Sequence, residues 1–356
     1  MTVTRRRAMA LRDGFVAQGA VAVETPILQP AELLLDLYGE DIRARAYVTS
    51  DALRGEQMLR PDFTVPVVQM HMAHGAEPAR YTYAGEVFRR QEDDPDRANE
   101  FLQVGYEVFD RVNPAAADAE VFALFAQAVA HLGLRAATGD IGILTSAVNG
   151  LRTTERRKAA LRRHIWRPRR FRTLLDRFAG RADIPETRQA LLDGTAVSHA
   201  PLIGLRGPSE IRERVDALRS DAAEPPISAV EMDGLDALLA VRETLPFAVQ
   251  HLRDLAVDLP AIARAVSKME ARIEALSARG VDVDTLEFET SFGRTSMEYY
   301  DGFVFGFYAE SRPDLPAIAS GGRYDALTRR LGNGQEIPAV GGVLRPGLMV
   351  DLEVAT

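Results

Sequence analysis

A carboxylate and an amide flank a glycine on one predicted strand of this sequence. Residues 80–110 alternate in the manner of two strands joined by a long acidic loop. Because successive side chains of a strand point to opposite faces, Gln103, Gly105 and Glu107 share one face. The glycine leaves a hollow where a small ligand can approach the backbone. The pattern predicts a floor for a small cationic or amino-bearing ligand; the alternative is an ordinary half-exposed strand with two solvated polar side chains.

Other polar residues offer weaker chemistry. Asp62 and Thr64 precede a predicted helix, which both residue types can cap. His71 and His74 stand three apart on that helix, but no acidic or cysteine partner with ligand spacing follows, so we expect no metal and no other cofactor. Gly321-Gly322 lacks the context of a phosphate loop, and these glycines are expected either to let a ligand approach the backbone or to serve packing. Nothing resembles a nucleophile elbow or a catalytic triad.

The segment 80–110 resembles motif 2 of the class II aminoacyl-tRNA synthetases, in its histidyl form. Five further matches follow that family's order, and the whole resemblance covers roughly 1–150 and 284–345. Motif 1 is resembled by Glu24-Thr25-Pro26-Ile27-Leu28, and the amino-acid-binding loop by Leu59-Arg60-Pro61-Asp62-Phe63-Thr64. The Tyr-Tyr signature is resembled by Met297-Glu298-Tyr299-Tyr300, and the Gly-Gly-Arg-Tyr-Asp signature by Ser320-Gly321-Gly322-Arg323-Tyr324-Asp325. The start of motif 3 is resembled by Pro338-Ala339-Val340-Gly341.

The departures from the synthetase pattern concern phosphate binding. Two positions that hold arginine in the synthetase hold Thr295 and Leu348 here, with Arg294 one place from the first. Arginines hold a nucleotide's phosphates through paired, charge-assisted hydrogen bonds. The loop between the two strands is also acidic, with Arg97 opposed by Glu92, Asp93, Asp94, Asp96 and Glu100. We therefore expect adenylation to be lost and the amino-acid site to be kept. Because the sequence stops at Thr356, we expect the synthetase's C-terminal anticodon-binding domain to be missing.

This combination resembles the regulatory subunit of ATP phosphoribosyltransferase, a paralogue of histidyl-tRNA synthetase. The resemblance implies a non-catalytic subunit that binds L-histidine, activates the short catalytic subunit of the first step of histidine biosynthesis, and mediates feedback inhibition within a hetero-oligomer. It also implies a dimer through the motif 1 region. Glu107 and Gln103 would hold the amino group or imidazole of histidine, and Arg89 its carboxylate. The full set of implied histidine-binding residues is Asp62, Thr64, Arg89, Gln103, Glu107, Tyr299 and Tyr300.

Two other functions stay open at this point. A truncated synthetase-like enzyme would activate histidine, although the missing arginines at 295 and 348 argue against it. A pseudo-synthetase would bind RNA through the basic stretch 152–172, where aromatic residues are sparse. That stretch is otherwise a solvated helix face or a docking surface for an acidic partner protein. Its basic residues are Arg152, Arg156, Arg157, Lys158, Arg162, Arg163, Arg167, Arg169, Arg170 and Arg172.

Composition sets broad limits on the class of protein. With 356 residues, 46% of them hydrophobic, the chain can build the cores of two or three domains. No apolar run approaches the roughly 18 residues that cross a bilayer, and no apolar stretch follows the basic N-terminus, so neither a membrane span nor a signal peptide is expected. The lack of cysteine excludes disulfides and thiolate chemistry. The net charge of −8 argues against wholesale nucleic-acid binding. These features fit a cytoplasmic protein.

Strand patterns frame a long helical block. We expect helices over 5–18, 64–74 and 115–132, a short strand at 138–144, and strands at 283–289 and 299–308. Between about 146 and 281 the pattern is almost wholly helical, with breaks at prolines. This order implies a discontinuous class II synthetase-like core at 1–150 and 284–356, with a mainly helical insert at 151–283. The expected fold class is α+β, with a mainly antiparallel sheet flanked by helices.

Overall fold

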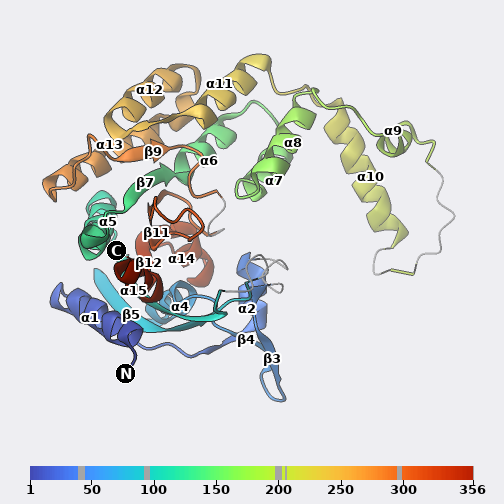
Figure 1. Ribbon diagram of the computed structural model, residues 1–356. Coiled ribbons are helices and arrows are strands. Elements are labelled where there is room, and N and C mark those ends of the chain that lie inside the picture. Colours follow the sequence, from blue (N-terminus) through green and yellow to red (C-terminus); the bar gives the residue numbers. More distant parts are fainter. Residues whose placement is uncertain (39–44, 92–96, 197–202, 205–206, 295–298, 356) are drawn as a thin grey trace.

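A nine-stranded sheet runs through the computed structural model, which describes residues 1–38, 45–91, 97–196, 203–204, 207–294 and 299–355 (Figure 1). Among the described strands the pairs are antiparallel, except β1–β5 and β7–β9. The expected α+β class with a mainly antiparallel sheet is confirmed. In spatial order the strands are β1 (Val21–Ala22), β5 (Ala79–Phe88), β6 (Glu100–Phe109), β12 (Ala339–Leu344), β11 (Ala319–Arg323), β10 (Phe303–Tyr308), β7 (Arg135–Asp140), β9 (Glu287–Glu289) and β8 (Arg242–Thr244).

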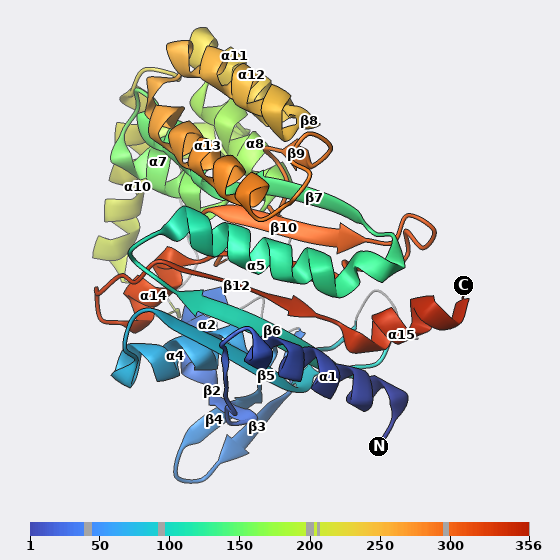
Figure 2. The same ribbon diagram turned by 90° about the vertical axis from the view of Figure 1, so that its left-hand side faces the viewer.

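The apolar side of β6 packs on a helical layer. Val104, Tyr106 and Val108 are fully buried, as their alternation along the strand predicts. Two helices, α1 (Val3–Ala17) and α5 (Pro114–Val129), cover this face, and Figure 2 shows both lying along the sheet. The ring of Phe15 on α1 lies 5.2 Å from Tyr106 and 5.7 Å from Phe125 of α5, measured between centroids. The opposite face of β6 is therefore the one available for a site.

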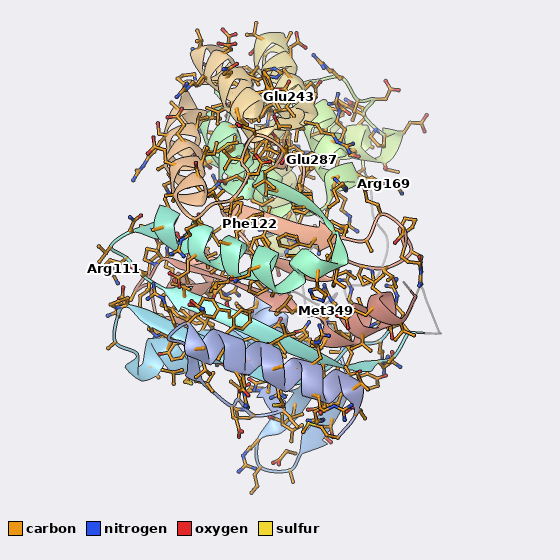
Figure 3. All side chains as sticks on the ribbon, turned by 60° about the vertical axis from the view of Figure 1, so that its left-hand side comes forward. Arg111, Phe122, Arg169, Glu243, Glu287 and Met349 are labelled. Atoms are coloured by element: carbon orange, nitrogen blue, oxygen red, sulfur yellow. The ribbon has the colours of Figure 1, made fainter. Side chains whose placement is uncertain are left out.

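One helical stretch, Pro114–Leu132, is long and apolar enough to cross a membrane by length and composition. In this fold its apolar side chains form part of the core. Phe122, labelled in Figure 3, lies on α5 with its ring centroid 5.5 Å from Phe305 and 5.3 Å from Phe307 of β10. Phe125 is fully buried beside it. This stretch is hydrophobic because its apolar side chains pack against the sheet.

A buried network of ion pairs joins α5 to the helix α13 (Ala263–Ala278). Arg272 of α13 donates from Nε to Asp118 at 2.9 Å and from Nη2 to Asp140 at 2.8 Å. Arg323 of β11 donates from Nη2 to the other oxygen of Asp118 at 2.7 Å. All four side chains are buried. Because removing one partner would leave a charge uncompensated in the interior, the network holds α13 and α5 in one arrangement.

The helical block between β7 and β9 contains one short strand that the sequence did not predict. The strand β8 pairs with β9 and extends the main sheet. Among the helices, α8 and α10 begin at prolines, and Figure 1 shows α9 and α10 on the far side of this block from the sheet. The block comprises α6 (Ile141–Gly150), α7 (Glu155–Arg163), α8 (Pro168–Phe178), α9 (Glu186–Asp193), α10 (Pro208–Ala223), α11 (Ala229–Ala240), α12 (Leu245–Asp258) and α13. The domain limits at 151–283 remain a prediction.

Some predicted strand boundaries were wrong. The strand expected at 138–144 ends at Asp140, whose Oδ1 accepts a hydrogen bond from the Gly142 amide at 2.9 Å and so caps α6. The strand expected at 283–289 is only β9, and the one expected at 299–308 begins at Phe303. In each case a hydrogen-bonding side chain or a turn next to the strand shortens an apolar alternation that continues in the sequence.

Several basic side chains of the stretch 152–172 make hydrogen bonds and ion pairs within the helical block. Arg157 is buried and donates from Nε to Asp221 at 2.8 Å and from Nη1 to the carbonyl of Pro225 at 2.8 Å. Arg172 forms an ion pair with Asp176 at 3.1 Å. Arg169, labelled in Figure 3, is exposed on the surface of the block. These contacts favour a structural role for part of the stretch over the RNA-binding alternative.

A small second sheet follows the motif 1 region. Its order is β2 (Leu28–Pro30), β4 (Gly55–Leu59) and β3 (Val48–Asp51), and the helix α2 (Ala31–Tyr38) follows β2. Apolar side chains here are exposed to solvent, among them Ile27, Leu28 and Val48 at 44%, 49% and 40% of full exposure. Exposed apolar groups on neighbouring elements are typical of a contact surface. The dimer implied for this region stays a prediction.

Candidate functional site

Glu107 lies fully buried on β6 with three hydroxyl groups directed at its carboxylate. Oε1 accepts hydrogen bonds from Thr64 Oγ1 at 3.0 Å and from the Tyr83 hydroxyl at 2.9 Å, and Oε2 accepts one from the Tyr324 hydroxyl at 2.6 Å. Thr64 begins α4 (Thr64–His74), Tyr83 lies on β5, and Tyr324 follows β11. Four segments that are distant in sequence therefore meet at one carboxylate. The face of β5, β6 and β12 that carries Tyr83, Glu107 and Gly341 is termed the site face.

Two arginines fix the loop that carries Asp62 and Thr64. Arg60 donates from Nη1 to the carbonyl of Thr25 at 2.6 Å and from Nε to that of Glu86 at 2.8 Å, which ties the motif 1 region to β5. Arg89 donates from Nε to the carbonyl of Pro61 at 2.6 Å. Within the loop, the ring of Phe63 stacks on Tyr83 with 4.3 Å between centroids. The loop is thus held against β5 at the distance that lets Thr64 reach Glu107.

Glycines on the site face make room for protein side chains. A Cβ atom at Gly105 would lie 2.1 Å from the ring of Tyr83, so this ring fills the hollow that was predicted to hold a ligand. For Gly321 and Gly322 both a ligand contact and packing were expected, and the structure favours packing: a Cβ at Gly322 would lie 2.8 Å from the ring of Tyr300, and one at Gly321, on the opposite face of the sheet, 2.5 Å from the ring of Phe305. A Cβ at Gly341 would lie 1.4 Å from Glu107 Oε2. These glycines allow bulky groups to lie flat on the sheet around Glu107.

Gln103 is the site-face residue whose hydrogen bonding is unmet. Its side chain is fully buried, and neither Nε2 nor Oε1 has a hydrogen-bond partner among the described residues. Buried polar atoms are nearly always bonded, and an unmet one costs about 1–3 kcal/mol. An amide offers both a donor and an acceptor, so a small polar ligand could satisfy both atoms. This is the strongest single indication that a ligand binds here.

Two tyrosines and a second carboxylate complete the surroundings of Glu107. The buried Tyr300 has its pKa raised, first by burial and then by the charge of Glu107. The ring of Tyr299 lies 4.9 Å from Tyr300 and 6.1 Å from Tyr324, between centroids. Asp62 is buried and accepts a hydrogen bond from the Val65 amide at 3.3 Å, so it steadies the start of α4 as its residue type predicts. The predicted residues Asp62, Thr64, Glu107 and Tyr300 therefore lie close together, and Gln103 lies four residues before Glu107 on the same face of β6.

Burial raises the pKa of Glu107 to about 7. The three hydroxyl groups favour the charged form and act in the opposite direction, while the nearby charge of Asp62 raises the pKa further. Near neutral pH the unliganded carboxyl group is therefore about half protonated. A ligand ammonium group would favour the carboxylate, so its binding would release a proton.

We expect this titration to appear in the stability of the protein. Because the folded pKa lies above the ordinary glutamate value of 4.5, the native state holds the proton over pH 4.5–7 and stability falls as the pH rises through that window. Glu107→Gln removes this titration. Relative to the wild type, the variant should gain roughly 3 kcal/mol in free energy of unfolding between pH 4.5 and 8. Urea unfolding of both proteins across this range measures the difference; a difference that stays constant with pH would contradict the account.

The arginine next to the expected catalytic position is directed to the helical block. Arg294 is buried, donates from Nε to the carbonyl of Ile165 at 2.8 Å, and places its guanidinium 4.9 Å from the ring centroid of Phe171. The expected position itself, Thr295, lies outside the described residues, as do 92–96 of the acidic loop. Leu348, at the other departure, lies on α15 (Pro346–Ala355) and packs on the hydrophobic core. The guanidinium of Arg294 therefore serves the contact with α8.

His71 packs against aromatic side chains. It is buried, its Nδ1 lies 3.1 Å from the Tyr81 hydroxyl, and its ring stacks on Phe109 with 3.9 Å between centroids. Burial lowers its pKa. Among the described residues, no group of three or more His, Cys, Asp or Glu side chains is placed to hold a metal ion.

Two residues that contact Glu107 were absent from the predicted site, Tyr83 and Tyr324. Tyr83 pairs directly with Gly105 across the hairpin, so a bulky residue opposite a glycine was the available signal. Tyr324 belongs to the Gly-Gly-Arg-Tyr-Asp signature, whose arginine instead enters the buried ion-pair network. Of the predicted residues, Arg89 contacts the loop at Pro61, and its role toward a ligand stays a prediction.

Comparisons with known proteins place this fold in a class. A sequence model of histidyl-tRNA synthetases matches residues 2–204 and 209–346. A solved structure described as an ATP phosphoribosyltransferase regulatory subunit/histidyl-tRNA synthetase from Bacillus halodurans superposes with a TM-score of 0.68, at 21% identity, over 98% of this chain and 78% of that one. Histidyl-tRNA synthetase from Nostoc sp. PCC 7120 superposes with a TM-score of 0.64, at 17% identity, over 99% of this chain and 71% of that one. The protein has the histidyl-tRNA synthetase-like fold.

The sequence relatives narrow the class further. The ATP phosphoribosyltransferase regulatory subunit of Brucella ovis is 33% identical over 357 residues, which cover 93% of each chain. The counterpart from Brucella abortus is also 33% identical and covers 93% of this chain and 92% of its own. The chain belongs to the family of ATP phosphoribosyltransferase regulatory subunits, so its role is regulatory and not catalytic.

Proposed function

We propose that this chain binds L-histidine on the site face, activates a short-form ATP phosphoribosyltransferase catalytic subunit, and mediates feedback inhibition of the first step of histidine biosynthesis. The observation that carries histidine binding is the buried Gln103, whose amide has no partner among the described residues and which lies on the same face of β6 as the buried carboxylate of Glu107. Membership of the regulatory-subunit family supports the partnership. The proposal includes a hetero-oligomer in the cytoplasm and a dimer through the motif 1 region.

The ligand's charges can be matched to the site. An ammonium group near Glu107 would pair with a carboxylate that three hydroxyls already orient. The Gln103 amide can then serve either the amino group or the imidazole. Tyr299 and Tyr300 would bound the imidazole, and Arg89 would face the carboxylate. In the described structure Glu107 is fully shielded, so entry of a ligand requires that the groups covering it move.

Feedback requires that histidine distinguish two states of the assembly. A ligand shifts an equilibrium only by its difference in affinity between the states. In the sequence Arg294 precedes Tyr299 by five residues, and Arg294 contacts Ile165 and Phe171 of the helical block. A shift at Tyr299 and Tyr300 could therefore reach the surface of that block.

The proposal is tested by calorimetric titration of L-histidine into the chain and by gel filtration of the chain mixed with a short-form catalytic subunit. We expect saturable histidine binding and co-elution. A chain that neither binds histidine nor co-elutes would contradict the proposal. Pyrophosphate exchange dependent on ATP and histidine would instead favour the truncated synthetase-like enzyme, and salt-dependent tRNA binding would favour the RNA-binding alternative.

A further inference from the structure

The site face continues past Gln103 to a residue that the sequence comparison with synthetases did not single out, Arg345. In the antiparallel pairing of β6 with β12, Glu107 lies opposite Gly341 and Gly105 opposite Val343. Side chains that are directly opposite share a face, and every second residue repeats it. Continuing this register by two residues brings Arg345 opposite Gln103, with both side chains on the site face.

The same reasoning brings Arg89 to this end of the site face. On β5, Tyr83 lies opposite Gly105, Gly85 opposite Gln103 and Val87 opposite Phe101. Arg89 is the next residue of that alternation, and its amide donates to the carbonyl of Asn99 at 2.8 Å, which extends the hairpin. Three neighbouring strands therefore present Arg89, Gln103 and Arg345 on one face.

Neither arginine is neutralised by a carboxylate in an ion pair among the described residues. Arg345 is partly buried, and its guanidinium donates from Nη1 to the carbonyl of Ala317. Arg89 donates from Nε to the carbonyl of Pro61 at 2.6 Å. Burial and the charge of Arg89 lower the pKa of Arg345 to about 10, so it stays protonated at pH 7. Two cations close enough to repel each other, beside an unsatisfied amide, favour the binding of an anion.

We propose that Arg345 and Arg89, with the amide nitrogen of Gln103, form a subsite for the α-carboxylate of the bound amino acid, which leaves the Gln103 oxygen for the amino group or the imidazole. This inference rests on the proposed function and adds a specificity-determining residue to it. Tyr300 lies near both ends of the site: burial and the charge of Glu107 raise the pKa of its hydroxyl, and the charge of Arg345 lowers it. The ammonium group at Glu107 and the carboxylate at Arg345 then match the two charges of a zwitterion. The subsite selects histidine over analogues that lack a carboxylate.

The test compares L-histidine with L-histidinol, which keeps the amine and the imidazole but carries an alcohol in place of the carboxylate. Binding of each ligand is measured by calorimetry to the wild type, Arg345→Gln and Arg345→Lys. We expect the wild type to prefer histidine about 10- to 100-fold, because a charge-assisted pair is lost with histidinol. In Arg345→Gln this preference should fall to within about threefold, with histidinol affinity unchanged. Arg345→Lys, which keeps the charge without the planar fork, should be intermediate.

A matched control is Arg312→Gln, because Arg312 is exposed and pairs with Asp314. It should keep the full preference for histidine. If Arg345→Gln binds histidinol as the wild type does and still prefers histidine by the wild-type ratio, the subsite is overturned while histidine binding stands. A second outcome would also overturn the carboxylate assignment. Pyrophosphate would compete with histidine for the wild type but not for Arg345→Gln, and Arg345→Gln would keep the wild-type preference for histidine over histidinol. The arginines would then bind phosphate. If the wild type binds neither L-histidine nor L-histidinol, the proposed function fails and the subsite with it.

Discussion

Glu107→Gln is expected to weaken L-histidine binding about 100-fold at pH 8. At this pH the wild-type carboxyl is mostly ionised, since its pKa is about 7, and the imidazole of free histidine is neutral. The glutamine keeps the size of the side chain but cannot neutralise a ligand ammonium group. Its amide nitrogen would also replace one oxygen of Glu107 that accepts hydrogen bonds in the wild type. Depending on the orientation of the amide, the nitrogen would face the hydroxyl of Tyr324 or those of Thr64 and Tyr83. Calorimetric titration of histidine measures the change.

The control for this substitution is Glu86→Gln, the same chemical change on the adjacent strand β5. Glu86 alternates with Tyr83 and Gly85 and lies on the opposite face of the sheet, where it pairs with Arg5. It should leave histidine affinity within about twofold of the wild type. The feedback assay should follow the binding, with inhibition lost in Glu107→Gln while co-elution with the catalytic subunit persists. A folded Glu107→Gln variant that binds histidine with wild-type affinity would exclude Glu107 from the site.

Gly341→Ala is expected to lower the free energy of unfolding by about 3 kcal/mol and to abolish histidine binding. The added Cβ would lie 1.4 Å from Glu107 Oε2 and 2.9 Å from the carbonyl of Tyr106. The carboxylate has little freedom to retreat, because it is buried and held by three hydroxyl groups. The strands or the side chain must therefore shift, and the geometry around Glu107 is lost. Urea unfolding and histidine titration measure the two effects.

Gly347→Ala is the matched control for this overpacking. A Cβ there would lie 3.8 Å from Thr4 Cγ2, an ordinary contact, and alanine favours the helix α15 by up to about 1 kcal/mol over glycine. It should be neutral or stabilising and should leave histidine binding intact. If Gly341→Ala unfolds at the wild-type urea concentration, the close approach of β12 to Glu107 is not as described.

The alternation of β6 was sufficient to predict which side chains lie in the core and which lie toward a site. Val104, Tyr106 and Val108 are buried against α1 and α5, and Gln103 and Glu107 lie on the other face, because a two-residue period follows directly from strand geometry. The order of strands and helices also predicted the α+β class. Local periodicity could not show that β8 lies within the helical block, since three residues are too few to establish an alternation.

The arrangement around Glu107 depends on contacts between distant segments, which no local pattern reports. A glycine at 105 indicated space, but only the register of β5 with β6 shows that Tyr83 fills it. Counting back from Tyr300 placed Arg294 next to the position of the synthetase's catalytic arginine, yet its side chain contacts Ile165 of the helical block. Arg345 was not predicted because it departs from the position of the motif 3 arginine by three residues, and its place follows from the pairing of β12 with β6.

The most direct test of the central claim measures phosphoribosyl-ATP formation by a short-form ATP phosphoribosyltransferase catalytic subunit, with and without this chain, while L-histidine is titrated. The account predicts that the chain raises the activity and that histidine then suppresses it, with Glu107→Gln keeping the activation and losing the suppression. Activity that is the same with and without the chain at every histidine concentration would contradict the account.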